Sequence, residues 1–279
     1  MKHLSIAHES IDDFHVDESG YKSDLIVENL TSQGNGKVFL RSEEISAKIM
    51  VNFRSTSGCK LFIGSNIQGN ITINFRGDNS LIYIGNQCRL NDLQIRSFQN
   101  NDFIAIGNQV TTTASNVWIS GNGAGESDPA IIIGDDCMFA YDIVLRNSDA
   151  HPIFSFDTEE QINEPNGIIH IEPHVWIGER VSILKNVTVG ACSIVGLGSI
   201  VTKDVPRFSI ARGNPAISEL KPGIYWSRNS GDVARTEAKS FVQRYTISKN
   251  GKSSKTKHRL LAKLRDYYAS SFSKTFERW

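Results

Sequence analysis

The sequence predicts an all-β solenoid: a parallel β-helix of hexapeptide repeats, with an inserted loop and a mainly helical C-terminal extension. Three observations predict this fold. A six-residue repeat runs through the C-terminal half, looser copies of the same unit precede it, and apolar residues at helical spacing follow it. The chain has 279 residues, 39% of them hydrophobic, which is enough for a substantial buried core.

The strict repeat runs from Ile171 to Val201. Large aliphatic residues recur at every sixth position: Ile171, Ile177, Ile183, Val189, Val195 and Val201. A small or β-branched residue stands four positions after each of the first five: Val175, Val181, Val187, Ser193 and Ser199. In a helix these repeats would point to three different sides, because six residues advance roughly 600°. Short strands joined by corners keep such positions on one face, so the pattern indicates a β-helix.

Looser copies of the unit precede the strict repeat. They are Leu61–Gly64, Ile82–Gly85, Ile104–Gly107 and Ile131–Gly134, with a fifth at Ile169–Glu172. Three hexapeptides make a coil of about 18 residues, and the last gap between copies is about twenty residues longer. This insertion, around 149–165, is where we expect function, because solenoids carry insertions on their working face.

Small residues occupy fixed positions in the repeat. We expect Gly178, Gly190 and Gly196 to lie at corners that need a permissive backbone. Cys88 and Cys137 occupy the small interior position and are predicted to be buried core residues, while Cys192 falls on a corner. No cysteine stands at metal-ligand or disulfide-framework spacing, and His170–His174 lacks the helical His-Glu-x-x-His arrangement. We therefore expect no metal and a reducing compartment.

The formal net charge of zero hides an asymmetry. Residues 221–279 hold 14 Lys and Arg against 4 Asp and Glu, which leaves 16 basic and 26 acidic residues in 1–220. The N-terminal region has no apolar run, and no stretch approaches the roughly 20 apolar residues of a membrane span. We expect a soluble cytoplasmic protein.

Several segments together resemble a known family. They are the hexapeptides from Ile171 to Val201, the closing Val201–Pro206 and Gly213–Ala216, and the upstream Ser148–Ile153 with its His-Pro pair. Over about residues 131–215 the chain resembles the left-handed β-helix acyltransferases. It is most similar to capsular polysaccharide and lipopolysaccharide O-acetyltransferases and to maltose and galactoside acetyltransferases. The resemblance implies a left-handed β-helix, a homotrimer with active sites between neighbouring subunits, acetyl-CoA as donor, and direct transfer without an acyl-enzyme.

Acetyl transfer to a hydroxyl needs a general base and donors for the oxyanion. By resemblance His151, in the insertion, is the catalytic base. Asp149 either accepts a hydrogen bond from the imidazole or shapes the loop through an Asx turn. Trp176 occupies a non-core position of its hexapeptide and should point outward. By resemblance it lies beside the histidine in the acceptor and acyl groove, with packing against a neighbouring subunit as the alternative.

The donor and acceptor contacts follow from the same resemblance. The residues expected to bind CoA are Gly178, Glu179, Gly196, Leu197, Lys203, Arg207 and Arg212. The three cations would contact its phosphates, although Ile217 stands where the family often has an arginine. Asp128, five residues before Ile133, matches a substrate-binding carboxylate of the galactoside enzymes, and it also fits an ordinary turn. Asn122 is a second candidate for the acceptor.

We divide the chain into an N-terminal cap (1–36), the β-helix acyltransferase domain (37–223) and a basic C-terminal extension (224–279). In the extension, apolar residues from Leu260 to Phe276 follow helical spacing with flanking cations. This segment either packs on the β-helix or a neighbouring subunit, or contacts an anionic membrane at its inner face. No nucleic-acid-binding motif is present, so we expect no nucleic-acid partner.

These observations predict an O-acetyltransferase that moves acetyl from acetyl-CoA to a sugar hydroxyl of a capsular or other cell-surface polysaccharide. Two alternatives stay open. One is a transferase for a small acceptor, such as a nucleotide-sugar amine or an antibiotic. The other is a catalytically silent β-helix scaffold.

Overall fold

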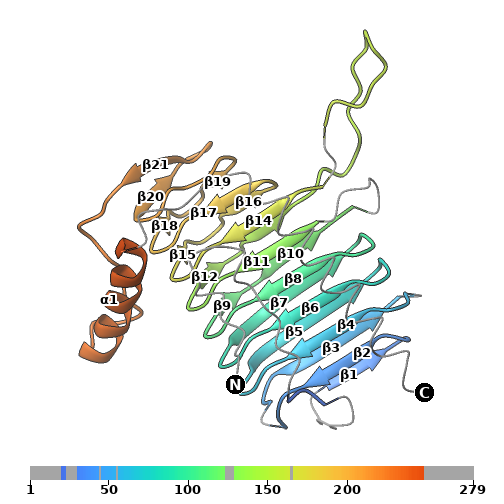
Figure 1. Ribbon diagram of the computed structural model, residues 1–279, viewed down its shortest axis with the longest axis horizontal. Helices are drawn as coiled ribbons and strands as arrows, with labels where there is room; N and C mark the ends of the chain where they lie inside the picture. Colours follow the sequence, from blue (N-terminus) through green and yellow to red (C-terminus); the bar gives the residue numbers. More distant parts are fainter. Residues whose placement is uncertain are drawn as a thin grey trace.

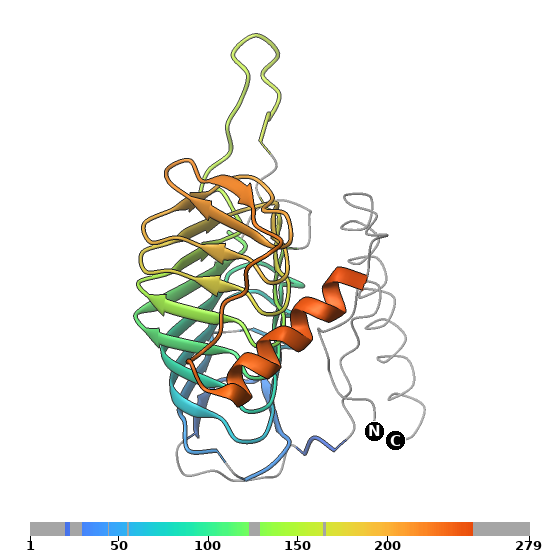
Figure 2. The same ribbon diagram turned by 90° about the vertical axis from the view of Figure 1, so that its left-hand side faces the viewer.

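The computed structural model describes residues 20–22, 30–43, 45–54, 56–122, 129–163 and 166–247. It is a column of stacked coils whose faces are parallel sheets, with helix α1 (Asp232–Ile247) lying against its side (Figures 1 and 2). The predicted all-β solenoid is confirmed.

One face of the column is a seven-stranded parallel sheet. Its strands are β2 (Lys37–Leu40), β4 (Lys60–Ile63), β6 (Leu81–Ile84), β8 (Phe103–Ile106), β11 (Ala130–Ile133), β14 (Ile168–Ile171) and β17 (Val187–Val189). The five predicted copies of the unit form β4, β6, β8, β11 and β14. Their register sets Ile82, Ile104 and Ile131 opposite one another, as stacked repeats require.

The second sheet begins with long strands and then divides. The long strands are β3 (Lys48–Phe53), β5 (Gln68–Phe75) and β7 (Arg89–Ser97), and the short β1 (Leu30–Gln33) pairs with β3. One branch continues through β10 (Asn116–Ser120), β13 (Val144–Arg146), β16 (Ser182–Leu184) and β19 (Ile200–Val201). The other continues through β9 (Thr111–Ala114), β12 (Met138–Tyr141), β15 (Trp176–Ile177), β18 (Ile194–Val195) and β20 (Ser209–Arg212), which pairs antiparallel with β21 (Ile217–Leu220). Early coils therefore have two strands and later coils three, the form that strict hexapeptides produce.

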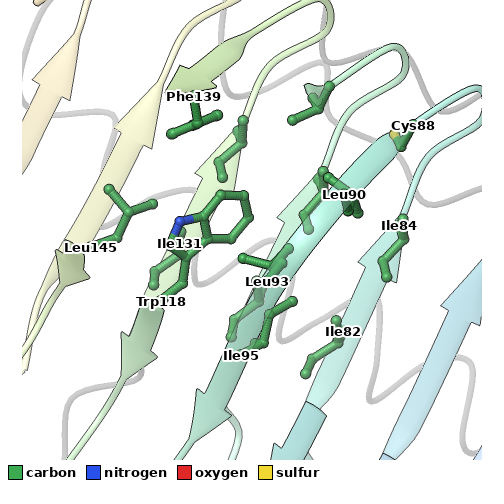
Figure 3. Close-up of a cluster of buried hydrophobic side chains, with 14 of the residues drawn as sticks. Ile82, Ile84, Cys88, Leu90, Leu93, Ile95, Trp118, Ile131, Phe139 and Leu145 are labelled. Carbon is green, nitrogen blue, oxygen red and sulfur yellow. The ribbon is translucent and has the colours of Figure 1, made fainter. Parts of the chain in front are cut away.

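The interior of the column is a continuous apolar core. Every aliphatic residue of the six-step pattern from Ile171 to Val201 is at most 1% exposed, which confirms that they point inward. Trp118 fills the interior beside Phe139, with ring centroids 5.0 Å apart (Figure 3). Cys88 and Cys137 are buried in the small position as predicted, and burial raises the pKa of the Cys88 thiol to about 12.

The corner glycines act differently from our expectation. Gly178, Gly190 and Gly196 do not have left-handed φ, so the prediction that they supply a permissive backbone is wrong. The left-handed corner positions are Arg180, Cys192 and Gly198, with φ of 55°, 61° and 70°. Gly178 and Gly190 instead make room for the next coil. A Cβ on Gly178 would lie 2.8 Å from the Leu197 nitrogen, and one on Gly190 would lie 2.4 Å from the Arg207 nitrogen.

Both ends of the chain lie largely outside the described residues. Within the predicted cap, β1 pairs with β3, so strand pairing starts before residue 37. The predicted helical extension contains α1, whose Tyr245 packs on Ala191 and Cys192 at a corner of the column. The amphipathic segment 260–276 lies outside the described residues. Within those residues, no helix has the length and apolar composition needed to cross a bilayer.

Candidate active site

The predicted insertion projects from the column as an arm, defined here as residues 149–163 (Figures 1 and 2). Its two sides are joined by backbone hydrogen bonds, including Ile162 N to Ile153 O at 2.8 Å and Ser155 N to Glu160 O at 2.9 Å. Its apolar side chains are exposed in a single chain: Ile153, Phe154, Ile162 and Phe156, the last 98% exposed. The arm therefore presents apolar surface that one copy leaves in water.

The residues that precede the arm are fixed to the column. Asn147 is buried and donates through Nδ2 to Ser120 Oγ at 2.7 Å and to the Ala130 carbonyl at 3.1 Å. Its Oδ1 accepts from the Gly121 amide at 2.9 Å, and Ser148 Oγ donates to the Gly121 carbonyl at 2.8 Å. Because every polar atom of the Asn147 amide is engaged, the arm begins from a fixed position.

Asp149 ties the two ends of the arm together. Its Oδ2 accepts from Asn163 Nδ2 at 2.8 Å and forms an ion pair with Lys185, and Asn122 donates to its backbone carbonyl. Partial burial raises the pKa of Asp149, but the hydrogen bonds from Lys185 and Asn163 outweigh burial, so the pKa lies below its ordinary value. Among the described residues its recorded partners do not include the His151 imidazole.

His151 is exposed at the base of the arm. Its backbone carbonyl accepts from Asn163 Nδ2 at 3.1 Å, which holds the backbone in place. Within the described part of the chain its imidazole makes no hydrogen bond, so both ring nitrogens are open to an incoming group.

Trp176 points outward from β15 and is 38% exposed, as predicted. Its ring lies 6.3 Å from that of Trp226, which stacks on His174 at 4.2 Å. The arm follows β13, whereas Trp176 lies on β15, which belongs to the other branch of the sheet. One chain therefore does not bring Trp176 and His151 together.

The residues predicted to bind CoA are distributed over three edges of the column. Gly178, Glu179, Gly196, Leu197 and Arg212 lie on the edge that follows β15, β18 and β20. There Leu197 is 69% exposed, Glu179 accepts through its carbonyl from the Gly198 amide, and a Cβ on Gly198 would meet nothing within 4 Å. This edge therefore has an exposed apolar side chain at Leu197 and open space beside Gly198.

Two predicted cations lie elsewhere. Lys203 follows β19 and is exposed on the edge that carries the arm. Arg207 lies on the third edge, where Nε and Nη2 contact the Glu172 carboxylate at 2.5 and 2.7 Å and the guanidinium lies 4.9 Å from the Tyr245 ring. Because Glu172 neutralises the charge of Arg207, this side chain is poorly placed to bind a phosphate. Its contact with the Tyr245 ring instead helps to hold α1 against the column.

A solved structure is similar to the chain over most of its length. The polySia-specific acetyltransferase NeuO is 30% identical, with a TM-score of 0.66, and the match covers 79% of this chain and 99% of that one. The chain belongs to the left-handed β-helix acyltransferases. The left-handed parallel β-helix that the family resemblance implied is therefore confirmed.

Two curated relatives in this acyltransferase family match shorter segments. A polysialic acid O-acetyltransferase from Escherichia coli O1:K1 / APEC is 44% identical over 98 residues, which is 35% of this chain and 31% of the relative. One from Neisseria meningitidis is 35% identical over 128 residues, 39% of this chain and 57% of the relative. The chain thus spans about a third and somewhat over half of these two relatives. No family model matches it.

The remaining predicted residues have other positions. Asp128 lies outside the described residues, and Asn122 holds the base of the arm. In the segment His170–His174, Glu172 pairs with Arg207, and His174 Nδ1 lies 2.7 Å from Asp136 Oδ2. Among the described residues no group of three or more His, Cys, Asp or Glu could hold a metal ion.

Four residues that shape the site were missed in the sequence: Asn147, Asn163, Lys185 and Trp226. None lies in a motif. Each acts through a contact with another coil or with the opposite side of the arm, which the repeat pattern does not specify.

Proposed function

We propose that this chain transfers an acetyl group from acetyl-CoA to a hydroxyl of a capsular or other cell-surface polysaccharide, with His151 as general base. The observation that carries the proposal is an exposed imidazole without a hydrogen-bond partner among the described residues, held at the anchored base of the arm. Relatives of the chain are named as O-acetyltransferases or acetyltransferases of polysialic acid, which supports a polysaccharide as the acceptor.

The catalytic assembly is a homotrimer with sites between copies. His151 and Lys203 lie on the edge of the arm, Leu197 lies on the edge that follows β18, and Trp176 lies on β15 near Trp226 and His174. A second copy placed alongside would bring one copy's arm against the other's Trp176. It would also cover Phe156, whose burial is favourable by about 1.5–3 kcal/mol.

Acetyl-CoA supplies a thioester whose carbonyl is attacked directly by the acceptor. The edge at Leu197 and Gly198 suits an extended pantetheine chain, because Leu197 is 69% exposed and a Cβ on Gly198 would meet nothing within 4 Å. His151 removes the proton from the acceptor hydroxyl as attack begins and returns it to the departing sulfur. Trp176 borders the acyl group, and backbone N–H groups stabilise the oxyanion.

The test is His151→Ala in the full chain. Without the base, kcat should fall by about 10²-fold or more, with acetyl-CoA binding by calorimetry unchanged. Asp157→Ala, an exposed residue of the same arm, is the matched control and should retain activity. Full activity in His151→Ala would exclude the mechanism. A panel of polysaccharides and small amines then separates polymer from small-acceptor transfer, and a scaffold would bind no acetyl-CoA.

A further inference from the structure

A line of arginines crosses the outer face of the sheet from β3 to β13. The parallel register places five outward residues opposite one another on successive strands: Asn52, Asn74, Arg96, Ile119 and Arg146. Two positions further along the first strands stand Arg54 and Arg76, whose amides continue the same ladder to Phe75 O and Ser97 O at 3.1 and 2.8 Å. We call Arg54, Arg76, Arg96 and Arg146 the arginine file.

None of the four arginines has a carboxylate within ion-pair distance among the described residues. Their recorded side-chain contacts are neutral: Arg96 Nη2 donates to Gln94 Oε1 at 3.0 Å, and Arg146 Nε to the Ser148 carbonyl at 3.1 Å. By contrast, Arg180, Arg207, Arg212, Arg228 and Arg235 each pair with an Asp or Glu. The file is thus a line of positive charge without a close ion pair among the described residues, and Arg146 also interacts electrostatically with the Asp149 carboxylate. It lies within a segment, 1–220, that has 26 acidic and 16 basic residues.

The file leads to the candidate base. Arg146 ends β13 and bonds to Ser148, directly before the arm that carries His151. Neighbouring strands lie about 4.8 Å apart, so the four steps from β3 to β13 span about 19 Å. A ligand lying along the column axis would therefore meet the file first and His151 at its end.

The side chains of the file also offer an apolar surface. The Arg76 guanidinium lies 4.7 Å from the Phe98 ring centroid, and Ile119 stands between Arg96 and Arg146 in the register. Alternating cations and apolar faces suit a chain of sugar rings that carry anionic groups, since guanidinium groups bind carboxylates and an aromatic face accepts a ring. The four arginines follow one another along successive strands, which suits one extended polymer chain better than a flat membrane.

We propose that the arginine file binds an acidic polysaccharide along the column and delivers its hydroxyls to His151. This inference rests on the proposed function and specifies its acceptor as a polyanion. The file is then a binding track for the polymer, and its arginines take no part in the chemical step.

The test replaces three file residues in the full chain: Arg54→Gln, Arg76→Gln and Arg96→Gln. Arg146 is kept because it contacts the base of the arm. The control, Lys37→Gln, Lys48→Gln and Arg89→Gln, removes the same charge from exposed positions off the file. The probe is fluorescent polysialic acid, used for direct binding at low salt and as acceptor, with a sialic acid dimer as the short acceptor.

The file variant should bind the polymer about tenfold more weakly and raise its KM similarly, because three exposed charge pairs are lost. Its kcat, its KM for acetyl-CoA and its KM for the dimer should match the control. Added salt should weaken polymer binding less in the file variant than in the control.

Different failures have different meanings. If the unmodified chain does not bind the polymer, or the file variant binds it as tightly as the control does, the track is excluded. If the loss appears with phosphatidylserine vesicles and not with the polymer, the file is a membrane surface and the proposal is overturned. If polymer binding is lost in the file variant but the unmodified chain transfers no acetyl group, the track stands and the proposed function fails.

Discussion

The column and the arm differ in how much of their apolar surface is buried within a single chain. In the column, the aliphatic residues of the repeat are at most 1% exposed and the strands pair coil upon coil. In the arm, the backbone is hydrogen-bonded but Phe156 is 98% exposed. The column is therefore stabilised within one copy, whereas the arm is ordered by its backbone and leaves its apolar side chains exposed. The candidate base lies where these two regions meet.

The largest expected effect is the loss of a column side chain. Trp118→Ala would leave a cavity beside Phe139 and should lower the free energy of unfolding by about 3–5 kcal/mol. Trp176→Ala, which removes a partly exposed indole, is the matched control and should cost much less. Urea denaturation of both variants measures the difference. Equal losses would contradict the contrast between the interior and the outer face.

A second test uses pH on a buried carboxyl of the column. Burial raises the pKa of Asp102 to about 7, opposed by a hydrogen bond from Ser120. Because the folded pKa exceeds the unfolded one, the folded state holds the proton more tightly, so stability present below about pH 4 is lost as pH rises through about 7. A shift of this size corresponds to up to about 4 kcal/mol. Asp102→Asn should flatten the dependence of the free energy of unfolding on pH, measured by denaturation at a series of pH values from about 4 to 8. An unchanged slope would show that another group causes the dependence.

The smallest expected effect on the column comes from the arm tip. Phe156→Ser removes an exposed side chain and should change the free energy of unfolding of the column by about 0.5 kcal/mol or less. It should weaken assembly, because the tip is proposed to pack on a neighbouring copy. Sedimentation velocity compares oligomer distributions of this variant and Asp157→Ala. An unchanged oligomer distribution would show that the tip does not pack on a neighbouring copy.

The sequence predicted the column well because a six-residue period is a local property. Inward residues such as Ile177 and Val195 follow directly from it. The role of the corner glycines was misjudged because the period places Gly178 at a corner but does not show that the Leu197 backbone approaches it. Only the next coil explains why a side chain is excluded there.

The site was harder to predict, because the number of residues between two positions does not show whether they lie on the same edge of the column. Lys203 and Arg207 are four residues apart, yet one lies on the edge of the arm and the other pairs with Glu172 on a different edge. His151 was proposed from its motif and remains a prediction, whereas Lys185, which forms the ion pair with Asp149, comes from the following coil and was missed. The arrangement of charges around the arm thus depends on stacking.

The burial of the cysteines has a practical consequence. Cys59, Cys88, Cys137 and Cys192 are all free and buried, and burial raises the pKa of each thiol. Thiolates are the reactive form, so the folded chain should consume little of a colorimetric disulfide reagent. The thiol that the proposed transfer releases can then be titrated continuously in the presence of the protein, and a sudden rise in reagent consumption would report unfolding during the measurement.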